Sequence, residues 1–355
     1  MKTNHNYYID LAFQLAEINY GRTGLNPSVG CIIVKNNTVI SSGTTSINGR
    51  PHAEYNALFN LKNCSGASLY TTLEPCVHYG KTHPCVNIII KKKIKKVFYA
   101  FEDPDIRTFK KAKKVLNLKG INSQLISTKK YKKFYKSYFL NKIHNVPYVT
   151  AKIAISSDYM TINKKDKWIT NSSSRKIVHL LRHKTDCILS TSKTINKDNS
   201  LLNCRIKDLN NNKPDLFIID LSLNLRKNLL LNSYLKKRKT FLITKKINNS
   251  KIKIYKKLGY RIVLIDSLNT KNDFKILYQK IYKLGYSRIM IETGLTFLNS
   301  VLKNKMINEL YIFKGKNKLG KYGKNNSTAK YLKKYSTKRL TINLNGDKLY
   351  TKEFK

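Results

Sequence analysis

The sequence lacks any apolar run of about 18 residues, the length that a helix needs to cross a membrane. We therefore expect no transmembrane segment and no membrane partner. Residues 1–20 mix acidic and polar side chains into their apolar pattern, which is not the composition of a signal peptide. Cysteine is also scarce, with six residues scattered over a chain of 355. This usage indicates a reducing compartment instead of a disulfide framework, so we expect a cytoplasmic protein.

Acidic residues are few: Asp and Glu total 20, Lys and Arg total 69, and the formal net charge is +49. Such an excess can mark a nucleic-acid-binding surface. However, 58 of the basic residues are lysine, only 11 are arginine, and 38 residues are asparagine. Lys, Asn, Ile and Tyr have A/T-rich codons, and the lysines are spread over both halves of the chain. We therefore attribute the charge to a base-composition bias, and expect no specific nucleic-acid partner and only weak binding to polyanions at low salt.

The chain does contain a set of metal-binding residues, in P-H-A-E at 51–54 and T-L-E-P-C-V-H-Y-G-K-T-H-P-C at 72–85. The imidazole of His52 and the thiolates of Cys76 and Cys85 suit tetrahedral Zn²⁺ and leave a fourth position for water. Glu54 is not a ligand in this arrangement and can move protons to and from that water. The combination is typical of zinc deaminases, which remove an amino group from a heterocyclic ring.

Other interpretations of these residues remain open. A purely structural zinc site usually has four protein ligands in paired knuckles, and no second pair is present here. His78 and His83 could compete as ligands. The two cysteines could also be buried thiols, although Pro75 and Pro84 beside them favour metal binding.

Eight residues separate Cys76 from Cys85, whereas many zinc deaminases carry the two cysteines as C-x-x-C. The segment P-C-V-H-Y-G-K-T-H-P-C, together with N-P-S-V-G-C at 26–31, resembles the signature of the bifunctional deaminase/reductase family of riboflavin biosynthesis. The resemblance implies a cytidine-deaminase-like domain in which Asn26 contacts the substrate. On residue type alone, Asn26 could be an ordinary turn residue.

Residues 1–126 alternate between helical and strand patterns, which predicts a three-layer α/β/α deaminase domain. The expected helices are residues 8–16, 53–61 and 108–118, and the expected strands are residues 29–34, 39–42, 67–72, 95–100 and 121–126, with a hairpin turn at 36–37. We also expect a helix to begin at the turn formed by residues 74–76. His52 and Cys76 would then both lie at helix N-termini, where partial positive charge favours thiolate.

Residues 127–147 combine lysines with aromatic side chains and are predicted to form a helix that links two domains. Interleaved basic and aromatic residues can bind RNA. The helical spacing of Phe134, Tyr138 and Phe139 instead predicts that these rings pack inward.

A second domain is expected over residues 148–355. Its expected strands are residues 148–156, 187–191, 216–220, 240–244, 261–265 and 288–291, and its expected helices are residues 172–183 and 295–303. No G-x-G-x-x-G motif is present. The strand-to-helix turn at Gly294 can hold a pyrophosphate on helix N–H groups, or it can be an ordinary turn.

Four segments of this domain are similar to the reductase half of the same family: A-K-I-A-I-S-S-D at 151–158, W-I-T at 168–170, L-L-R at 180–182 and I-E-T-G at 291–294. The resemblance implies a dihydrofolate-reductase-like α/β fold that uses NADPH. It implies cofactor contacts at Ala154, Trp168, Thr194, Asp198 and Gly294, and substrate contacts at Asp166, Arg182, Leu202, Arg205 and Glu292. Guanidinium groups clamp phosphate well, which suits the two arginines. Lys152 is predicted to lie near the carbon that accepts hydride, although a surface lysine would fit the sequence as well.

Some positions depart from the family pattern. They are Tyr159 in place of a glycine, Asn199-Ser200 in place of Asp-Pro, Leu221 in place of a serine, His83 in place of a proline, and residues 105–111 in place of a glycine-rich stretch. The metal-binding residues and Glu54 are intact. We therefore expect a working deaminase and a reductase whose cofactor pocket departs from the family pattern.

The resemblance covers nearly the whole chain and implies two consecutive steps of flavin-precursor synthesis. The first domain would remove the 2-amino group of 2,5-diamino-6-(5-phosphoribosylamino)pyrimidin-4(3H)-one. The second would reduce the ribosyl group with NADPH, which gives 5-amino-6-(5-phosphoribitylamino)uracil. The resemblance also implies a homo-oligomer, so a homodimer is the default expectation and a larger homo-oligomer the alternative. The alternatives are a nucleic-acid (tRNA-type) base deaminase, a deaminase with an inactive reductase domain, and a non-enzymatic protein with a structural zinc ion.

Overall fold

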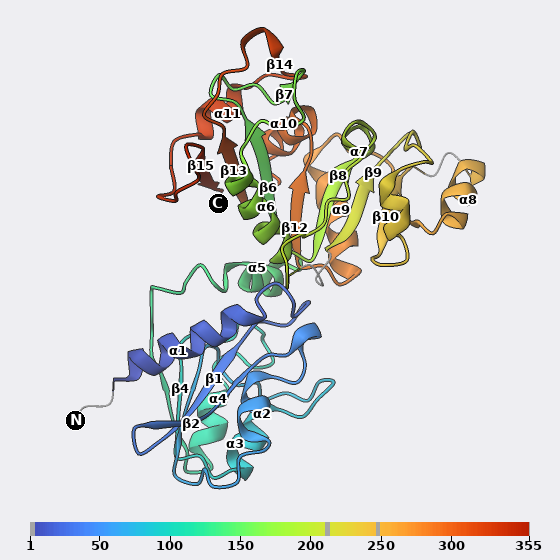
Figure 1. Ribbon diagram of the computed structural model, residues 1–355. Coiled ribbons are helices and arrows are strands. Elements are labelled where there is room, and N and C mark those ends of the chain that lie inside the picture. The colour runs from blue at the N-terminus through green and yellow to red at the C-terminus, as the bar shows by residue number, and fades with distance from the viewer. Residues whose placement is uncertain (1–3, 210–213, 246–248, 355) are drawn as a thin grey trace. The chain divides into compact units, whose positions relative to one another are not determined.

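The computed structural model describes residues 4–209, 214–245 and 249–354. The chain divides into two compact units, Met1–Val146 and Pro147–Lys355 (Figure 1). Each unit has its own β-sheet and its own hydrophobic core. None of the helices within the described ranges has the length and apolar character that crossing a bilayer requires.

The first unit is built on a five-stranded sheet with the order β2-β1-β3-β4-β5. Its strands are β1 (Gly30–Lys35), β2 (Thr38–Thr44), β3 (Ser68–Thr71), β4 (Lys96–Tyr99) and β5 (Asn122–Leu125). Its α-helices are α1 (His5–Ile18), α2 (Ala53–Leu58), α3 (Cys85–Lys91), α4 (Ala112–Asn117) and α5 (Lys136–His144). β1 runs antiparallel to β2 and β3, whereas β3, β4 and β5 are parallel to one another.

Two glycines show why helices cover both faces of this sheet. A Cβ atom on Gly30 of β1 would lie 1.8 Å from the carbonyl oxygen of Ala12 in α1. A Cβ atom on Gly43 of β2 would lie 2.4 Å from the carbonyl oxygen of Ala53 in α2. Gly43 pairs with Cys31, the residue after Gly30, so the two glycines face opposite sides of the sheet. Helices α1 and α2 therefore pack on opposite faces, which confirms the predicted three-layer domain (Figure 1).

All five predicted strands of this unit are present, with ends displaced by at most two residues. Asn36 and Asn37 both have positive φ, as a two-residue hairpin turn of the primed type requires. The prediction that a helix begins at residues 74–76 is wrong. Residues 75–84 contain two prolines and a glycine and form no helix, and α3 begins only at Cys85. The helices predicted at 53–61 and 108–118 are present but shorter.

Residues 127–147 are helical only from Lys136 onward, as α5. Tyr138 is buried, and Phe134 and Phe139 pack against the core of the first unit. The predicted inward packing is confirmed. Because these rings are occupied by protein contacts, they offer no platform on which RNA bases could stack.

The second unit is built on an eight-stranded sheet with the order β11-β10-β9-β8-β12-β6-β13-β15. Its strands are β6 (Tyr148–Ile155), β8 (Cys187–Thr191), β9 (Asp215–Ile219), β10 (Thr240–Thr244), β11 (Arg261–Leu264), β12 (Arg288–Glu292), β13 (Glu309–Lys314) and β15 (Lys348–Glu353), and β7 (Ile162–Asn163) pairs separately with β14 (Gly323–Lys324). Its α-helices are α6 (Ser172–His183), α7 (Ser192–Asp198), α8 (Asn249–Lys257), α9 (Lys271–Lys283), α10 (Leu295–Lys303) and α11 (Lys330–Tyr335). β13 and β15 are antiparallel, and the other neighbours in the large sheet are parallel.

Side chains of this sheet fill a core on each face. Along β12, Ile289 and Ile291 belong to one core, and Met290 between them belongs to the other. Strands that are buried on both faces read as nearly continuous apolar runs. All six strands predicted for this unit are accordingly present, and so are the two predicted helices.

Candidate active sites

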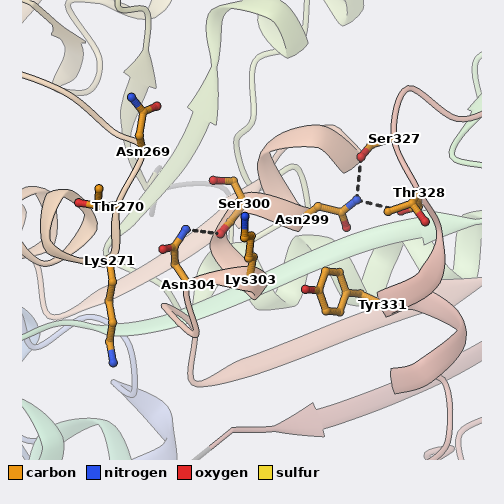
Figure 2. A pocket seen from close by; sticks show the side chains of 10 residues that line it. All are labelled: Asn269, Thr270, Lys271, Asn299, Ser300, Lys303, Asn304, Ser327, Thr328 and Tyr331. Carbon is orange, nitrogen blue, oxygen red and sulfur yellow. Dashed lines mark hydrogen bonds between the residues drawn. The ribbon is translucent and has the colours of Figure 1, made fainter.

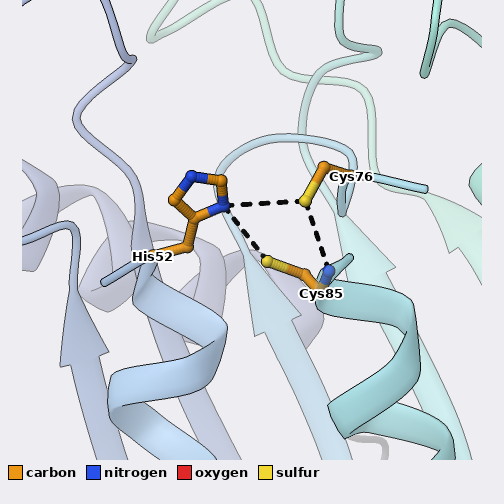
Figure 3. A group of neighbouring side chains, drawn as sticks. All are labelled: His52, Cys76 and Cys85. Atoms are coloured by element: carbon orange, nitrogen blue, oxygen red, sulfur yellow. Dashed lines mark hydrogen bonds between the residues drawn. The ribbon is translucent and has the colours of Figure 1, made fainter. Parts of the chain in front are cut away.

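Three side chains of the first unit converge on one point. The donor atoms of His52, Cys76 and Cys85 all lie within 4.8 Å of one another. His52 Nδ1 is 3.3 Å from the sulfur of Cys85 and 3.6 Å from the sulfur of Cys76 (Figure 3). One imidazole nitrogen and two sulfurs form a donor set that zinc takes in catalytic sites with an open fourth position. The residues present therefore fit zinc.

The local structure explains this convergence. His52 is the residue before α2, and Cys85 is the first residue of α3. Cys76 lies on the loop after β3, and its sulfur accepts a hydrogen bond from the backbone N–H of Cys85 at 3.2 Å. A hydrogen bond with the Cys85 side chain, supported by His52, lowers the pKa of the Cys76 thiol to about 4. Cys76 is therefore available as a thiolate ligand at neutral pH.

Glu54 lies beside this cluster without joining it. Its side chain is buried, and Oε2 is 3.4 Å from the sulfur of Cys85. Burial raises the pKa of Glu54 to about 7, and the negative charge of Cys76 acts in the same direction. A carboxyl group with such a pKa can both accept and donate a proton near neutral pH.

The two other histidines of the motif make different contacts. Nδ1 of His78 is 3.0 Å from the hydroxyl of Thr108, and the ring of His83 packs edge-on against Tyr79 with ring centres 5.6 Å apart. Within the described ranges, neither histidine belongs to the group of converging donor atoms. The cluster therefore consists of three protein ligands.

Asn26 lies beside the segment that leads to His52. Its side-chain Nδ2 donates a hydrogen bond to the carbonyl oxygen of Gly49 at 3.1 Å. Gly49 has a φ of 86°, and a Cβ atom there would lie 2.3 Å from that same Nδ2. Asn26 therefore packs tightly against the turn at Gly49, which lies three residues before His52 in the sequence.

Our sequence analysis missed Glu74, which fixes the loop before Cys76. The Glu74 carboxylate is buried and accepts backbone N–H groups from Asp103, Lys110 and Ala112 at 3.0–3.2 Å. The signal was present in T-L-E-P-C, because a carboxylate between apolar residues requires several hydrogen bonds when it is buried.

In the second unit, a buried carboxylate holds two cations. Glu292 ends β12, and Lys152 of β6 is paired with it in register. Lys152 Nζ is 3.2 Å from Glu292 Oε2, and Arg182 of α6 donates from Nε to Oε1 at 2.6 Å and from Nη2 to Oε2 at 2.9 Å. Burial alone would raise the pKa of Glu292, but Arg182 and Lys152 lower it to about 2. Three of the predicted site residues therefore form one charged group around Glu292 at the carboxyl end of β12. Open α/β sheets bind ligands at the carboxyl ends of their parallel strands.

Asn203 joins the two predicted arginines. Arg182 donates to the Asn203 carbonyl oxygen at 3.0 Å, and Arg205 donates to the Asn203 side-chain oxygen at 3.1 Å. The side chain of Leu202 is buried in the core, and its carbonyl oxygen accepts a hydrogen bond from Arg238 at 2.9 Å. Asn203 and Arg238 were missed by the sequence analysis, because an asparagine in a loop and one more arginine carry no distinctive pattern.

The predicted cofactor residues lie on several elements of the second unit. Thr194 of α7 accepts the backbone N–H of Gly294 at 3.2 Å, so the turn before α10 meets α7. Trp168 is half-exposed. Its backbone N–H donates to Asp166 at 3.2 Å, and the Arg175 guanidinium lies 4.5 Å from its ring centre.

Ala154 lies on β6 two residues after Lys152 and so faces the same side of the sheet. Asp198 ends α7, and the charges of Lys197, Lys152 and Lys167 act on it, although burial dominates and raises its pKa.

The turn at Gly294 fits a diphosphate group. A Cβ atom on Gly294 would meet no other atom within 4 Å, so a ligand can approach the backbone at the start of α10. The hydroxyl of Thr293 is buried and has no hydrogen-bond partner among the described residues. Backbone N–H groups at a helix N-terminus and a spare hydroxyl are the groups that bind phosphate oxygens.

Two departures from the family pattern are accommodated by the backbone. Tyr159 has a φ of 65°, a conformation that favours glycine, but its ring packs on the core and lies 3.9 Å from Lys314 Nζ. Asn199 has a φ of 41° at the C-terminus of α7, where asparagine is tolerated, and its side chain accepts the N–H of Leu230 at 2.9 Å. Leu221 packs against the core.

A pocket of about 640 Å³ lies between the first turn of α9, α10 and the segment before α11 (Figure 2). Its lining residues are Asn269, Thr270, Lys271, Asn299, Ser300, Lys303, Asn304, Ser327, Thr328 and Tyr331. It includes none of the residues predicted for either active site. Asp273 already satisfies the first turn of α9 there through a capping box, so an anion would meet a carboxylate. We assign no catalytic role to this pocket.

Two family models match the chain. The model described as the cytidine and deoxycytidylate deaminase zinc-binding region matches residues 2–101. The model described as the RibD C-terminal domain matches residues 147–341. Each match lies within one of the two units.

Curated proteins and solved structures agree with these matches. The chain is similar to the riboflavin biosynthesis protein RibD of Aquifex aeolicus, with 32% identity over 86% of this chain and 85% of that protein. It is similar to the protein of the same name from Buchnera aphidicola, with 33% identity over 90% of this chain and 88% of that protein. Among solved structures, RibD of Acinetobacter baumannii superposes with a TM-score of 0.84 and 26% identity over 98% of each chain. The two predicted fold classes are thereby confirmed.

Proposed function

Because the chain belongs to the RibD family of riboflavin-biosynthesis enzymes, we propose that it catalyses two consecutive reactions on one phosphorylated pyrimidine. The first unit hydrolyses the 2-amino group of 2,5-diamino-6-(5-phosphoribosylamino)pyrimidin-4(3H)-one and releases ammonia. The second unit reduces the ribosyl group with NADPH to give 5-amino-6-(5-phosphoribitylamino)uracil. The observation that carries this function is the convergence of His52, Cys76 and Cys85 beside the buried carboxyl of Glu54.

In the deaminase, His52, Cys76 and Cys85 would hold a zinc ion, which when bound would lower the pKa of water to about 7. Glu54 accepts one proton from the attacking water and gives it to the ring nitrogen. It then accepts the second proton of that water and gives it to the amino group, which leaves as ammonia. The pKa of about 7 supports both transfers, because the carboxyl can exist in either state at neutral pH. Asn26 contacts the substrate from the turn before His52.

In the reductase, NADPH when bound would supply a hydride to the sugar carbon. Lys152 lies near that carbon, and the Glu292 carboxylate holds its ammonium group in place. Arg182, Arg205, Asp166 and Leu202 line the substrate side with Glu292. Ala154, Trp168, Thr194, Asp198 and Gly294 contact the cofactor.

The surroundings of the enzyme are part of the same proposal. The substrate is a small phosphorylated molecule, and the protein acts in the cytoplasm as a homodimer or a larger homo-oligomer. The excess of lysine serves no nucleic-acid partner in this view.

One experiment tests both halves. The zinc-loaded protein is given the diaminopyrimidine substrate, and ammonia release and NADPH oxidation are followed together. Ammonia release followed by NADPH loss is expected. Ammonia release alone would favour the alternative of a deaminase with an inactive reductase, and would direct attention to Tyr159, Asn199 and Leu221. The absence of both ammonia release and NADPH oxidation would contradict the proposed function.

A further inference from the structure

Two buried aspartates connect α5 to a loop of the first unit. The hydroxyl of Tyr138 in α5 donates a hydrogen bond to Asp103 Oδ1 at 2.9 Å. One helical turn later, the ammonium group of Lys142 donates to Asp105 Oδ2 at 3.1 Å. Both aspartates are more than nine-tenths buried. Helix α5 therefore holds residues 103–111, which we call the Asp103 loop, from one side.

Several hydrogen bonds join residues of the Asp103 loop to one another. Asp103 accepts the backbone N–H of Asp105 at 2.9 Å. Asp105 in turn accepts the backbone N–H of Arg107 at 3.1 Å and its side-chain Nε and Nη2 at 2.9 and 2.6 Å. The loop contains no glycine, although the family pattern has a glycine-rich stretch here. Side-chain hydrogen bonds thus fix a segment that glycines would leave flexible.

The Asp103 loop forms hydrogen bonds with the metal-binding segment on both sides of Cys76. Two residues before Cys76, the carboxylate of Glu74 accepts backbone N–H groups of the loop at 3.1 and 3.2 Å. Two residues after Cys76, His78 Nδ1 is 3.0 Å from the hydroxyl of Thr108. Cys76 is the ligand that lies on a loop, whereas the two other ligands lie at the starts of helices. The position of Cys76 therefore depends on the loop that brackets it.

We propose that Tyr138 and Lys142 are positioning residues of the deaminase, which act through the Asp103 loop to hold Cys76 in place for zinc. The inference rests on the proposed function, because it gives these side chains a role in the zinc site. Neither residue contacts a metal ligand directly. Outer partners of metal ligands typically change metal affinity 10–100-fold. Tyr138 and Lys142 act from further out, so loss of either should weaken zinc binding by about tenfold, the lower end of that range.

The test uses the full-length protein with Tyr138→Phe or Lys142→Met. Zinc affinity is measured by competition with a chelator, and the ligand geometry is read from the absorption spectrum of the Co²⁺-loaded protein. Both variants should bind zinc about tenfold more weakly and show an altered Co²⁺ spectrum at saturating metal. Lys142→Arg keeps a cation for Asp105 and should restore both. Reductase activity on the deaminated intermediate should not change, because that site lies in the other unit.

Matched controls come from the same segment. Lys130→Met removes an ion pair of 2.7 Å with Asp10, and Tyr131→Phe removes a hydroxyl from a ring that stacks on Phe13. Neither control residue contacts the Asp103 loop, so both should keep the zinc affinity and Co²⁺ spectrum of the wild type. A general structural role would lower stability without changing the spectrum at saturating metal. Unchanged zinc affinity and spectrum in Tyr138→Phe and Lys142→Met would overturn the inference, as would equal shifts in the controls. A wild-type protein that neither binds zinc nor releases ammonia would overturn the proposed function and this inference together.

Discussion

Replacement of Glu292 by glutamine should destabilise the second unit strongly at neutral pH. The substitution keeps the size of the side chain but removes the charge that Arg182 and Lys152 share. Arg182 is 8% exposed and would remain as a buried, uncompensated cation. Removal of one partner from a buried ion pair typically costs about 3–5 kcal/mol.

The pKa of Glu292 gives a second and independent magnitude. Its decrease from 4.5 to about 2 corresponds to about 3 kcal/mol of stability contributed by the ionised carboxylate. Because the pKa is lower in the folded state, this contribution is fully present above about pH 4.5 and is lost as the pH falls towards 2. The two magnitudes agree, so we expect Glu292→Gln to lose about 3 kcal/mol at pH 7.

Urea unfolding followed by tryptophan fluorescence measures this loss in the second unit alone, because Trp168 is the one tryptophan of the chain. The difference in unfolding free energy between the wild type and Glu292→Gln should be largest at pH 7 and should disappear between pH 4.5 and 2. Asp266→Asn, which removes an exposed carboxylate from the same unit, should change the unfolding free energy by less than about 0.5 kcal/mol. A loss below about 1 kcal/mol at pH 7, or a gap that does not depend on pH, would refute the reasoning.

Three further predictions follow from the same structure. Glu54→Gln should lower ammonia release by about 10²–10⁴-fold, because it removes the proton shuttle, while zinc content and reductase activity stay at wild-type levels; retention of deaminase activity would contradict the role of Glu54. Lys152→Met should abolish NADPH oxidation with the deaminated intermediate but leave ammonia release intact, and a variant that still oxidises NADPH at the wild-type rate would show that Lys152 serves only as an ion-pair partner of Glu292. Gly30→Ala should destabilise the first unit by about 3 kcal/mol, since the new Cβ would overlap the Ala12 carbonyl oxygen. Gly66→Ala serves as its control in thermal unfolding, because a Cβ there would meet nothing within 4 Å, although its positive φ adds about 1 kcal/mol of backbone strain.

The strands could be predicted from the sequence because most of them are short apolar runs between polar turns. The strand β9 illustrates this, since Leu216 and Ile218 belong to one core and Phe217 and Ile219 to the other, which leaves a continuous apolar segment. The metal ligands could be predicted because their chemistry requires those residue types close together. By contrast, α9 was not predicted, although Thr270 and Asp273 form a capping box that marks its start.

The contacts around each site could not be predicted, because they join residues far apart in the sequence. Arg182 and Glu292 are separated by 110 positions and meet only in the folded chain, where the Arg182 side chain of α6 reaches the end of β12. Likewise, the hydrogen bond from Tyr138 to Asp103 depends on how α5, which follows β5, packs against the first unit. Local patterns specify elements, whereas such pairs are decided by packing. The mistaken helix at Cys76 has the same origin, because the loop is held open by Glu74 and its distant partners.

The scarcity of acidic residues acquires a structural meaning once their positions are known. Seven of the 20 are buried: Glu54, Glu74, Asp103, Asp105, Asp220, Glu292 and Asp347. Acidic residues are almost never fully buried unless they are paired, and here nearly every one holds backbone N–H groups or cations. Asp220 accepts the N–H groups of Asn224 and Leu225, for example, and Asp347 accepts that of Asn171. A base-composition bias towards lysine and asparagine can replace exposed acids at little energetic cost, but it cannot replace these without leaving buried donors unpaired. The net charge of +49 thus coexists with a set of buried acids that pair with backbone N–H groups and cations in the fold and in both sites.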